Sequence, residues 1–369
     1  MEPREVILEI GLFHMPLHPT DKPLVDVLAE NTEKIIYADQ LGYTETWIGE
    51  HYSASTEPIT SPMMFMASLI NQTKNIRFGT GVICLPNHHP AQVAGQAALF
   101  DHMTKGRFNM GIGPGGLASD MELFDVLDGS VRAEKFAESI KMITQIWSQD
   151  PPYDIKGKHW NIKLTDNVIP KLGVGYMSKP YTKPHPPISL SSMSPDGNSV
   201  AHAVKMGWKP ITANFSPEST VINHWGKYVE GCEAIGKKPD GKDWTVARNI
   251  LIADSDAQAE DWLLDPAGSD FYYFDYLWEV LKVANYTAVI KPIPTMDDAD
   301  VTVESIVRAS VIYGSRKTVI DKLMSLRERS GPWGVLLKAA MDGSGKNRER
   351  ERLTMRRLAE DVLPVINAG

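Results

Sequence analysis

The chain has 369 residues, of which 43% are hydrophobic and 23% charged, a balance typical of a globular protein with a large core. Its net charge of −8 disfavours a nucleic-acid-binding surface, and its two cysteines are too few for a disulfide framework. The sequence opens without a charged-then-apolar signal and contains no apolar run of membrane-spanning length, so we expect a cytoplasmic protein.

The N-terminal part of the chain alternates between strand-like and helix-like segments. Runs rich in β-branched and apolar residues predict strands at residues 5–13, 44–51, 76–86 and 107–113. Apolar positions at helical spacing predict helices at residues 23–42, 61–73 and 90–106. Pro90 suits the first turn of the third helix, and Gly106 suits its end.

The alternation of strands and helices is interrupted in the middle of the chain and then resumes. Residues 148–162 have turn residues flanked by alternating apolar positions and predict a surface hairpin, after which a Pro-rich segment (179–187) predicts a rigid connection. Further strands are predicted at residues 188–192, 208–215, 244–253 and 333–342. Further helices are predicted at residues 130–147, 197–207, 219–236, 316–331 and 350–366.

About eight strands in strict strand–helix order indicate an α/β fold, a single (β/α)8 TIM barrel over residues 1–369. Residues 254–304 are too many for a plain crossover, and we interpret them as an insertion before the last strand that forms a lid over the barrel mouth. A doubly wound sheet is the competing architecture. It would need a Gly-rich phosphate loop after the first strand, where this chain has GLFHMPLHP (11–19).

Residues that follow the strands of a barrel meet on one face, so they define a candidate pocket. In this chain they are His14, Met15, Glu50, His51, Asn87, His88, His89, the Gly-rich segment 113–117, Ser191–Ser194, Asn214, Phe215, Met341 and Asp342. Small and polar groups at these positions, with aromatic residues in the insertion, predict a pocket for a large and partly apolar ligand.

Each motif has a structural interpretation beside the functional one. His51 next to Glu50 is either a loop histidine satisfied by a carboxylate or a catalytic imidazole. GPGG (113–116) either turns the chain or lets its backbone approach a ligand, and Ser191–Ser194 either cap a helix or bind a phosphate. No metal is predicted, because His14, His51, His88 and His89 lack metal-ligand spacing among themselves.

Several stretches together resemble one family. LGYTETWIGEHY (41–52), residues 76–116 and QDPPYDIKGKHW (149–160) resemble the bacterial luciferase-like flavin-dependent monooxygenases. FHMPLHPTDKP (13–23), EHYSASTEPITSP (50–62) and GPGGLASD (113–120) are most similar to the limonene 1,2-monooxygenase-like branch. The similarity is dense from about residue 8 to 130, recurs through residues 150–215 and thins over the C-terminal third.

This resemblance implies a (β/α)8 barrel and a two-component flavin-dependent monooxygenase. Such an enzyme takes reduced FMN from a separate NAD(P)H:flavin reductase, forms a C4a-peroxyflavin with O2 as co-substrate, and oxygenates a small, largely apolar or cyclic molecule. It is expected to be a homodimer, as family members often are. The alternatives are a deazaflavin-dependent oxidoreductase on the same fold and a catalytically silent flavin-binding barrel.

The resemblance also implies roles for individual residues. His51 is the acid/base beside the flavin ring, and Glu50 orients His51 or contacts the flavin edge. The expected flavin-binding residues are Glu50, Gly81, Val82, Gly113, Pro114, Gly115, Ser191, Ser192, Met193 and Ser194, and the expected substrate pocket contains His14, Met15, Asn87 and Phe215. One position departs from the family: Pro114 stands where luciferases carry an Arg for the flavin phosphate, which leaves FAD open as the alternative to FMN.

Overall fold

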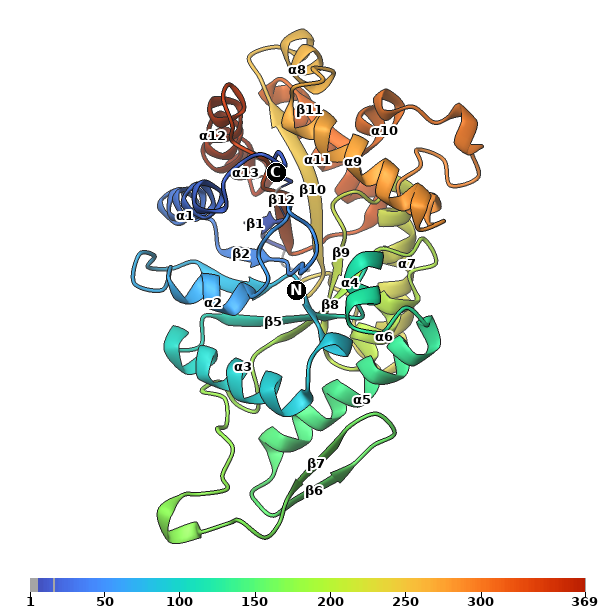
Figure 1. Ribbon diagram of the computed structural model, residues 1–369. Helices are drawn as coiled ribbons and strands as arrows, with labels where there is room; N and C mark the ends of the chain where they lie inside the picture. The colour runs from blue at the N-terminus through green and yellow to red at the C-terminus, as the bar shows by residue number, and fades with distance from the viewer. Residues whose placement is uncertain (1–5, 16, 369) are drawn as a thin grey trace. The chain divides into compact units, whose positions relative to one another are not determined.

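The computed structural model describes residues 6–15 and 17–368, which form two compact units (Figure 1). The first unit contains the chain up to Trp47 and the chain from Ser189 onward, and the second unit runs from Ile48 to Ile188. We describe each unit by itself.

The first unit is built on parallel strands. They are β1 (Glu9–His14), β2 (Glu45–Ile48), β8 (Ile188–Ser192), β9 (Lys209–Thr212), β10 (Thr245–Ile252), β11 (Val311–Gly314) and β12 (Val335–Ala339). β1 pairs with β12, β12 with β10, β10 with β9, and β9 with β8, all in parallel. The second half of β10, from Asn249, pairs instead with β11. The sequence pattern did not predict β11, because its four residues follow a helix with no turn residue between them.

Alternate strand residues form the interior of the first unit. Phe13, Trp47, Ile211, Ala247, Val335 and Leu337 pack in one cluster. Because successive strand side chains point to opposite faces, their neighbours face outward toward the helices. Lys338 shows this, since it lies next to Leu337 and its ammonium pairs with Glu351 on α12.

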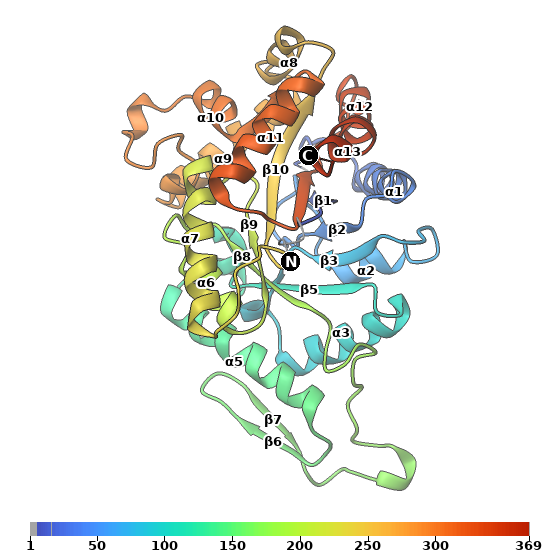
Figure 2. The same ribbon diagram turned by 180° about the vertical axis from the view of Figure 1, so that it is seen from behind.

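Helices cover the outward face of these strands. They are α1 (Leu24–Gln40), α6 (Asn198–Lys205), α7 (Glu218–Ala234), α11 (Arg316–Ser330), α12 (Asn347–Arg357) and α13 (Leu363–Ile366). A π-helical turn over Leu358–Val362 joins the last two. Figure 2 shows α11 between α7 and α13, in contact with both.

The predicted insertion (254–304) contains the helices α8 (Asp256–Leu263) and α9 (Ser269–Val283), and a third helix, α10 (Val303–Ser310), begins at its end. Tyr273 and Phe274 of α9 are buried in an apolar cluster with Leu251, Ala339 and Met341. Because these partners belong to the carboxyl-terminal parts of β10 and β12 or follow them directly, α9 lies at that end of the strands. Its role as a lid stays a prediction.

The second unit continues the same alternation. Its parallel strands are β3 (Arg77–Thr80), β4 (Ile83–Cys84) and β5 (Phe108–Gly113), and its helices are α2 (Pro62–Ala67), α3 (Pro90–Thr104), α4 (Ala118–Leu123) and α5 (Gly129–Ser148). The strand predicted at 76–86 is divided between β3 and β4 at Gly81–Val82, where the peptide bond is cis. The predicted hairpin is confirmed as the antiparallel pair β6 (Tyr153–Lys156) and β7 (Asn161–Leu164).

Parallel strands that alternate with helices make up the (β/α)8 barrel that the sequence predicted. Among the described residues, no helix is both long enough and apolar enough to cross a membrane.

Candidate active site

His51 lies in the loop that follows β2, and a carboxylate fixes its ring. Its backbone N–H donates to the carbonyl of Ile59 at 3.0 Å, which closes the loop. Its Nδ1 lies 2.9 Å from Oδ2 of Asp120 on α4. Asp120 also accepts hydrogen bonds from the backbone N–H of Ser53 at 2.8 Å, the backbone N–H of Tyr52 at 3.1 Å and the Ser53 hydroxyl. Three donors besides the imidazole itself therefore hold this carboxylate in place.

The same contacts set the charges of the pair. Burial raises the pKa of Asp120, but the hydrogen bonds from His51 and Ser53 outweigh it and leave this pKa below its ordinary value. Burial lowers the pKa of His51, but the hydrogen bond to Asp120 and the nearby carboxylates of Glu57, Asp120 and Glu50 outweigh it, so this pKa is raised. An imidazole whose orientation is fixed at Nδ1 and whose pKa is raised is suited to proton transfer through Nε2.

Sequence reasoning missed Asp120, which lies 69 positions from His51. No local pattern joins the two residues. Only the fold brings the first turn of α4 to the loop after β2.

Glu50 serves a different partner from the one expected. Its Oε1 accepts a hydrogen bond from the backbone N–H of Cys84 at 3.0 Å and lies 2.8 Å from Nε2 of His88. In the structure, therefore, Asp120 and not Glu50 orients the His51 ring. Burial, and then the charge of Glu50, raise the pKa of the Cys84 thiol well above its ordinary value and that of Tyr52 to about 12. Both groups stay neutral at physiological pH.

The Gly-rich segment after β5 lies beside Cys84. Cys84 is the register partner of Gly113, and a Cβ placed on Gly115 would lie 3.7 Å from the Cys84 sulfur. Gly115 has a φ of +92°, which an L-residue with a side chain adopts only under strain. The structure thus brings Glu50, β4 and the segment around Gly113–Gly115 together in the second unit. Asn87 is half-buried at the end of the short 3-10 helix Leu85–Asn87.

The serine run follows β8 in the first unit, and its members point in different directions. Ser191 is the register partner of the interior residue Ile211 and shares its face. Ser192 faces outward, where its hydroxyl accepts a hydrogen bond from Ser199 of α6 at 2.9 Å. The carbonyl of Ser194 lies 2.9 Å from Nε2 of His224. Ser191 is therefore the member of the run best placed toward the interior.

His14 alternates with the interior residue Phe13 and faces outward. Neither of its ring nitrogens has a hydrogen-bond partner among the described residues. Burial, followed by the charges of Lys34 and Lys338, lowers its pKa well below the ordinary value, so the ring is neutral. This position gives no support to the predicted pocket role of His14. Met15 is half-buried beside it.

A buried polar network anchors α9, and sequence reasoning identified only part of it. The amide nitrogen of Asn214 donates to Oδ1 of Asn249 at 2.7 Å and to the Tyr273 hydroxyl at 2.9 Å. The amide nitrogen of Asn249 in turn donates to Oδ1 of Asp270 at 2.9 Å. Phe215 packs against the apolar cluster of the same helix. The network places the predicted residues Asn214 and Phe215 under α9.

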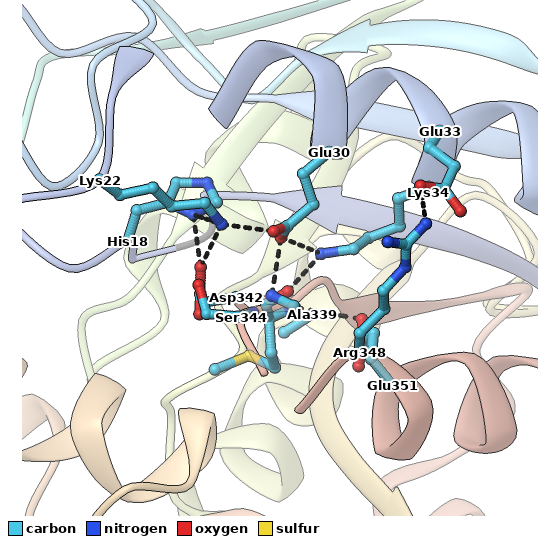
Figure 3. Close-up of polar contacts among 12 residues, drawn as sticks. His18, Lys22, Glu30, Glu33, Lys34, Ala339, Asp342, Ser344, Arg348 and Glu351 are labelled. Carbon is cyan, nitrogen blue, oxygen red and sulfur yellow. Dashed lines mark hydrogen bonds and ion pairs between the residues drawn. The ribbon is translucent and has the colours of Figure 1, made fainter. Parts of the chain in front are cut away.

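Asp342, which follows β12, belongs to an ion-pair network rather than to an open pocket (Figure 3). Its Oδ1 lies 2.8 Å from both the Lys22 ammonium and Nδ1 of His18. Glu30 of α1 contacts the same ammonium and accepts the backbone N–H of Gly343 at 2.7 Å. His18, Glu30 and Asp342 bring possible metal ligands within 4.8 Å of one another. Because the Lys22 ammonium already contacts all three, the cluster is explained as a buried ion pair that joins α1 to the segment after β12.

Comparison with known proteins decides the family. Residues 8–332 match the luciferase-like monooxygenase family. The chain belongs to this family. The family resemblance seen in the sequence is thereby confirmed. Membership of this family also accounts for the alternation of strands and helices.

Three named relatives cover nearly the whole chain. The 4-hydroxyprotoasukamycin monooxygenase of Streptomyces nodosus subsp. asukaensis is 32% identical over 98% of this chain and 93% of its own length. The limonene 1,2-monooxygenase of Rhodococcus erythropolis is 26% identical over 98% and 87%. The oxygenase component of the flavin-dependent trigonelline monooxygenase of Acinetobacter baylyi is 25% identical over 94% and 91%.

A solved structure confirms the fold of this luciferase-like monooxygenase. The oxygenating constituent of 3,6-diketocamphane monooxygenase from Pseudomonas putida, a type II Baeyer-Villiger monooxygenase in complex with FMN, matches with a TM-score of 0.85. The match covers 98% of this chain and 99% of that one, at 24% sequence identity.

Proposed function

We propose that this luciferase-like protein is the oxygenase of a two-component system. It uses reduced FMN, supplied by a separate NAD(P)H:flavin reductase, and O2 to oxygenate a small, largely apolar or cyclic molecule. The observation that carries the proposal is the His51–Asp120 pair, an oriented imidazole with a raised pKa in the loop after β2. The names of relatives support it, since one is an oxygenase component and another is solved with FMN. We expect a cytoplasmic homodimer.

The chemistry of several residues in the two units suits a flavin. Gly113 and Gly115 lie beside Cys84, and glycines without side chains would let a flat ring come close to the backbone there. Ser191 shares the interior face of Ile211 and carries a hydroxyl, a group that can bind a phosphate. All the flavin-binding residues stay predictions: Glu50, Gly81, Val82, Gly113, Pro114, Gly115, Ser191, Ser192, Met193 and Ser194. When bound, reduced flavin would supply the electrons that activate O2.

The protein's own part is to hold a proton where the reaction needs it. Asp120 keeps the proton of His51 on Nδ1, so the exchangeable proton of the imidazolium is the one on Nε2. His51 can donate that proton to a developing oxyanion or take one from a substrate hydroxyl. The neutral thiol of Cys84 and the neutral phenol of Tyr52 do not compete for this role near pH 7.

Rapid mixing tests the proposal. The protein is preloaded anaerobically with reduced FMN and mixed with oxygenated buffer while flavin absorbance is followed. We expect a spectrum distinct from both reduced and oxidised FMN that outlasts the oxidation of free flavin. His51→Ala should keep its affinity for FMN but release more H2O2 and less product per reduced flavin.

Oxidation at the rate of free FMN would overturn the proposal. The same protein would then be tested for hydride transfer with a reduced deazaflavin under anaerobic conditions, which would support the alternative activity. A flat titration with both cofactors would indicate a barrel without flavin chemistry.

A further inference from the structure

Glu57 lies on the side of His51 opposite Asp120. Its Oε2 is 3.5 Å from Nε2 of His51, and each of the two side chains is 12% exposed. The backbone fixes this arrangement, because the Glu57 N–H donates to the carbonyl of Ala54 and the His51 N–H donates to Ile59. The His51 ring therefore stands between two carboxylates, one at each nitrogen.

The two carboxylates have different surroundings. Asp120 accepts two backbone N–H groups and the Ser53 hydroxyl in addition to His51. Within the described residues, Glu57 has the imidazole as its ion-pair partner, and neither a backbone N–H nor a hydroxyl donates to its carboxylate. Burial, the largest effect, raises the pKa of Glu57, the charge of His51 lowers it and that of Asp120 raises it again, so this pKa is above its ordinary value. Of the two groups, Glu57 takes up a proton more readily.

We propose that Glu57 is a positioning residue that exchanges a proton with Nε2 of His51. The inference rests on the function proposed above. The Nε2–H bond of the imidazolium breaks, an O–H bond forms on Glu57, and the pair passes from two opposite charges to two neutral groups. The proton on Nδ1 stays with Asp120 throughout. Reversal of the step returns the proton to His51.

The reason for such an exchange is the exclusion of water. Oxygen chemistry on a reduced cofactor requires a dry site, so protons must enter and leave through side chains. Both side chains are mostly buried, so Glu57 offers the Nε2 proton of His51 a carboxylate acceptor where little water reaches it. A distance of 3.5 Å is longer than an ordinary hydrogen bond, so the transfer needs a small approach of the two groups or a bridging water.

The titratable and charged groups that face the pair are few and known. Asp120 on α4 and Glu50, just after β2, act on His51, and Asp120 also acts on Glu57. Glu122 lies on the same helix as Asp120 but is exposed, which makes Glu122→Gln a matched control.

The test is an NMR titration of the His51 ring in the flavin-free protein, with the signal identified from His51→Gln. We expect Glu57→Gln to lower the pKa of His51 by roughly half a unit to one unit, because it removes a neighbouring negative charge. Glu57→Asp should lower the pKa of His51 by less than Glu57→Gln does, since it keeps the negative charge but its shorter side chain holds the carboxylate farther from the ring. Glu122→Gln should leave the curve unchanged. An unchanged His51 curve in Glu57→Gln would overturn the inference.

The product yield per reduced FMN, measured against pH, gives a second readout. We expect the profile of Glu57→Gln to move in the same direction as the His51 titration, with His51 and Asp120 intact. A profile identical to that of the wild type would overturn the relay even if the NMR curve moved. If the wild type oxygenates nothing while the NMR coupling is present, the proposed function fails and the Glu57–His51 proton exchange stands.

Discussion

Asp270, in the first turn of α9, is a buried carboxyl group whose ionisation should control the stability of the insertion. It is 6% exposed and has one side-chain donor, the amide of Asn249 at 2.9 Å. Burial raises its pKa to about 6, against partial opposition from the Asn249 hydrogen bond and the charge of Lys338, while Glu351 adds to the rise. We therefore predict that Asp270→Asn stabilises the protein above pH 6.

The direction and size follow from proton linkage. The folded protein holds the Asp270 proton up to about pH 6, whereas an unfolded chain releases it near 3.8. The contribution of this group is thus fully present below about pH 4 and is lost as the pH rises through 6. Because one pKa unit corresponds to about 1.4 kcal/mol, the loss is roughly 3 kcal/mol. Asparagine removes the charge and can still accept the hydrogen bond from Asn249.

The measurement is urea unfolding of the wild type and Asp270→Asn at several pH values from 4 to 8, followed by far-UV circular dichroism. The free-energy difference should be small at pH 4 and grow to roughly 3 kcal/mol in favour of the variant by pH 7.5. Asp275→Asn is the control, because Asp275 lies on the same helix but is exposed. A difference that does not vary with pH, or a variant less stable than the wild type at pH 8, would refute the reasoning.

Two further predictions concern the site and the barrel. Asp120→Asn should lower the pKa of His51 by more than one unit, because it removes the negative charge beside the ring. It should also reduce the oxygenation rate on the order of 10²–10⁴-fold, because the amide NH2 favours the wrong imidazole tautomer. NMR titration and product assays measure the two effects, and an unchanged rate would contradict the prediction. Gly241→Ala should destabilise the fold by several kcal/mol in thermal unfolding, since Gly241 has a φ of +71° and a Cβ there would lie 1.5 Å from the Pro332 carbonyl oxygen. Gly236→Ala, which has a φ of +67° and open space, should cost about 1 kcal/mol, and equal losses in the two variants would contradict the steric argument.

The sequence predicted the architecture well because the barrel depends on repeated local patterns. Most predicted strands and helices are present, and the hairpin of β6 and β7 forms where alternating apolar residues flank a turn. β11 was missed because four residues directly after α10 carry no boundary signal. The sequence also predicted His51 as a site residue, because it follows a strand and active-site residues of barrels lie at the carboxyl ends of the strands.

The partners of these residues could not be read in the same way. The contact of His51 with Asp120 joins a loop to a helix 69 positions along the chain, and Glu50 contacts Cys84 and His88 instead of His51. For His14, the sequence pattern failed to predict which face of the strand the side chain lies on. One residue of strand register separates it from the interior residue Phe13, and a pattern read to within two residues does not fix that register.

Asp120 and Asp270 show why the chemistry of a carboxylate follows from its donors rather than from its place in the sequence. Both lie in the first turn of a helix, where the helix dipole favours a negative charge. Four donors keep Asp120 ionised, so it stays a fixed anion beside His51. One donor leaves Asp270 with a pKa of about 6, so its charge changes within the physiological range. Hence a fall in pH from 8 to 5 should leave the charge of Asp120 unchanged while it neutralises the anchor of α9, and the two effects should separate in a pH series.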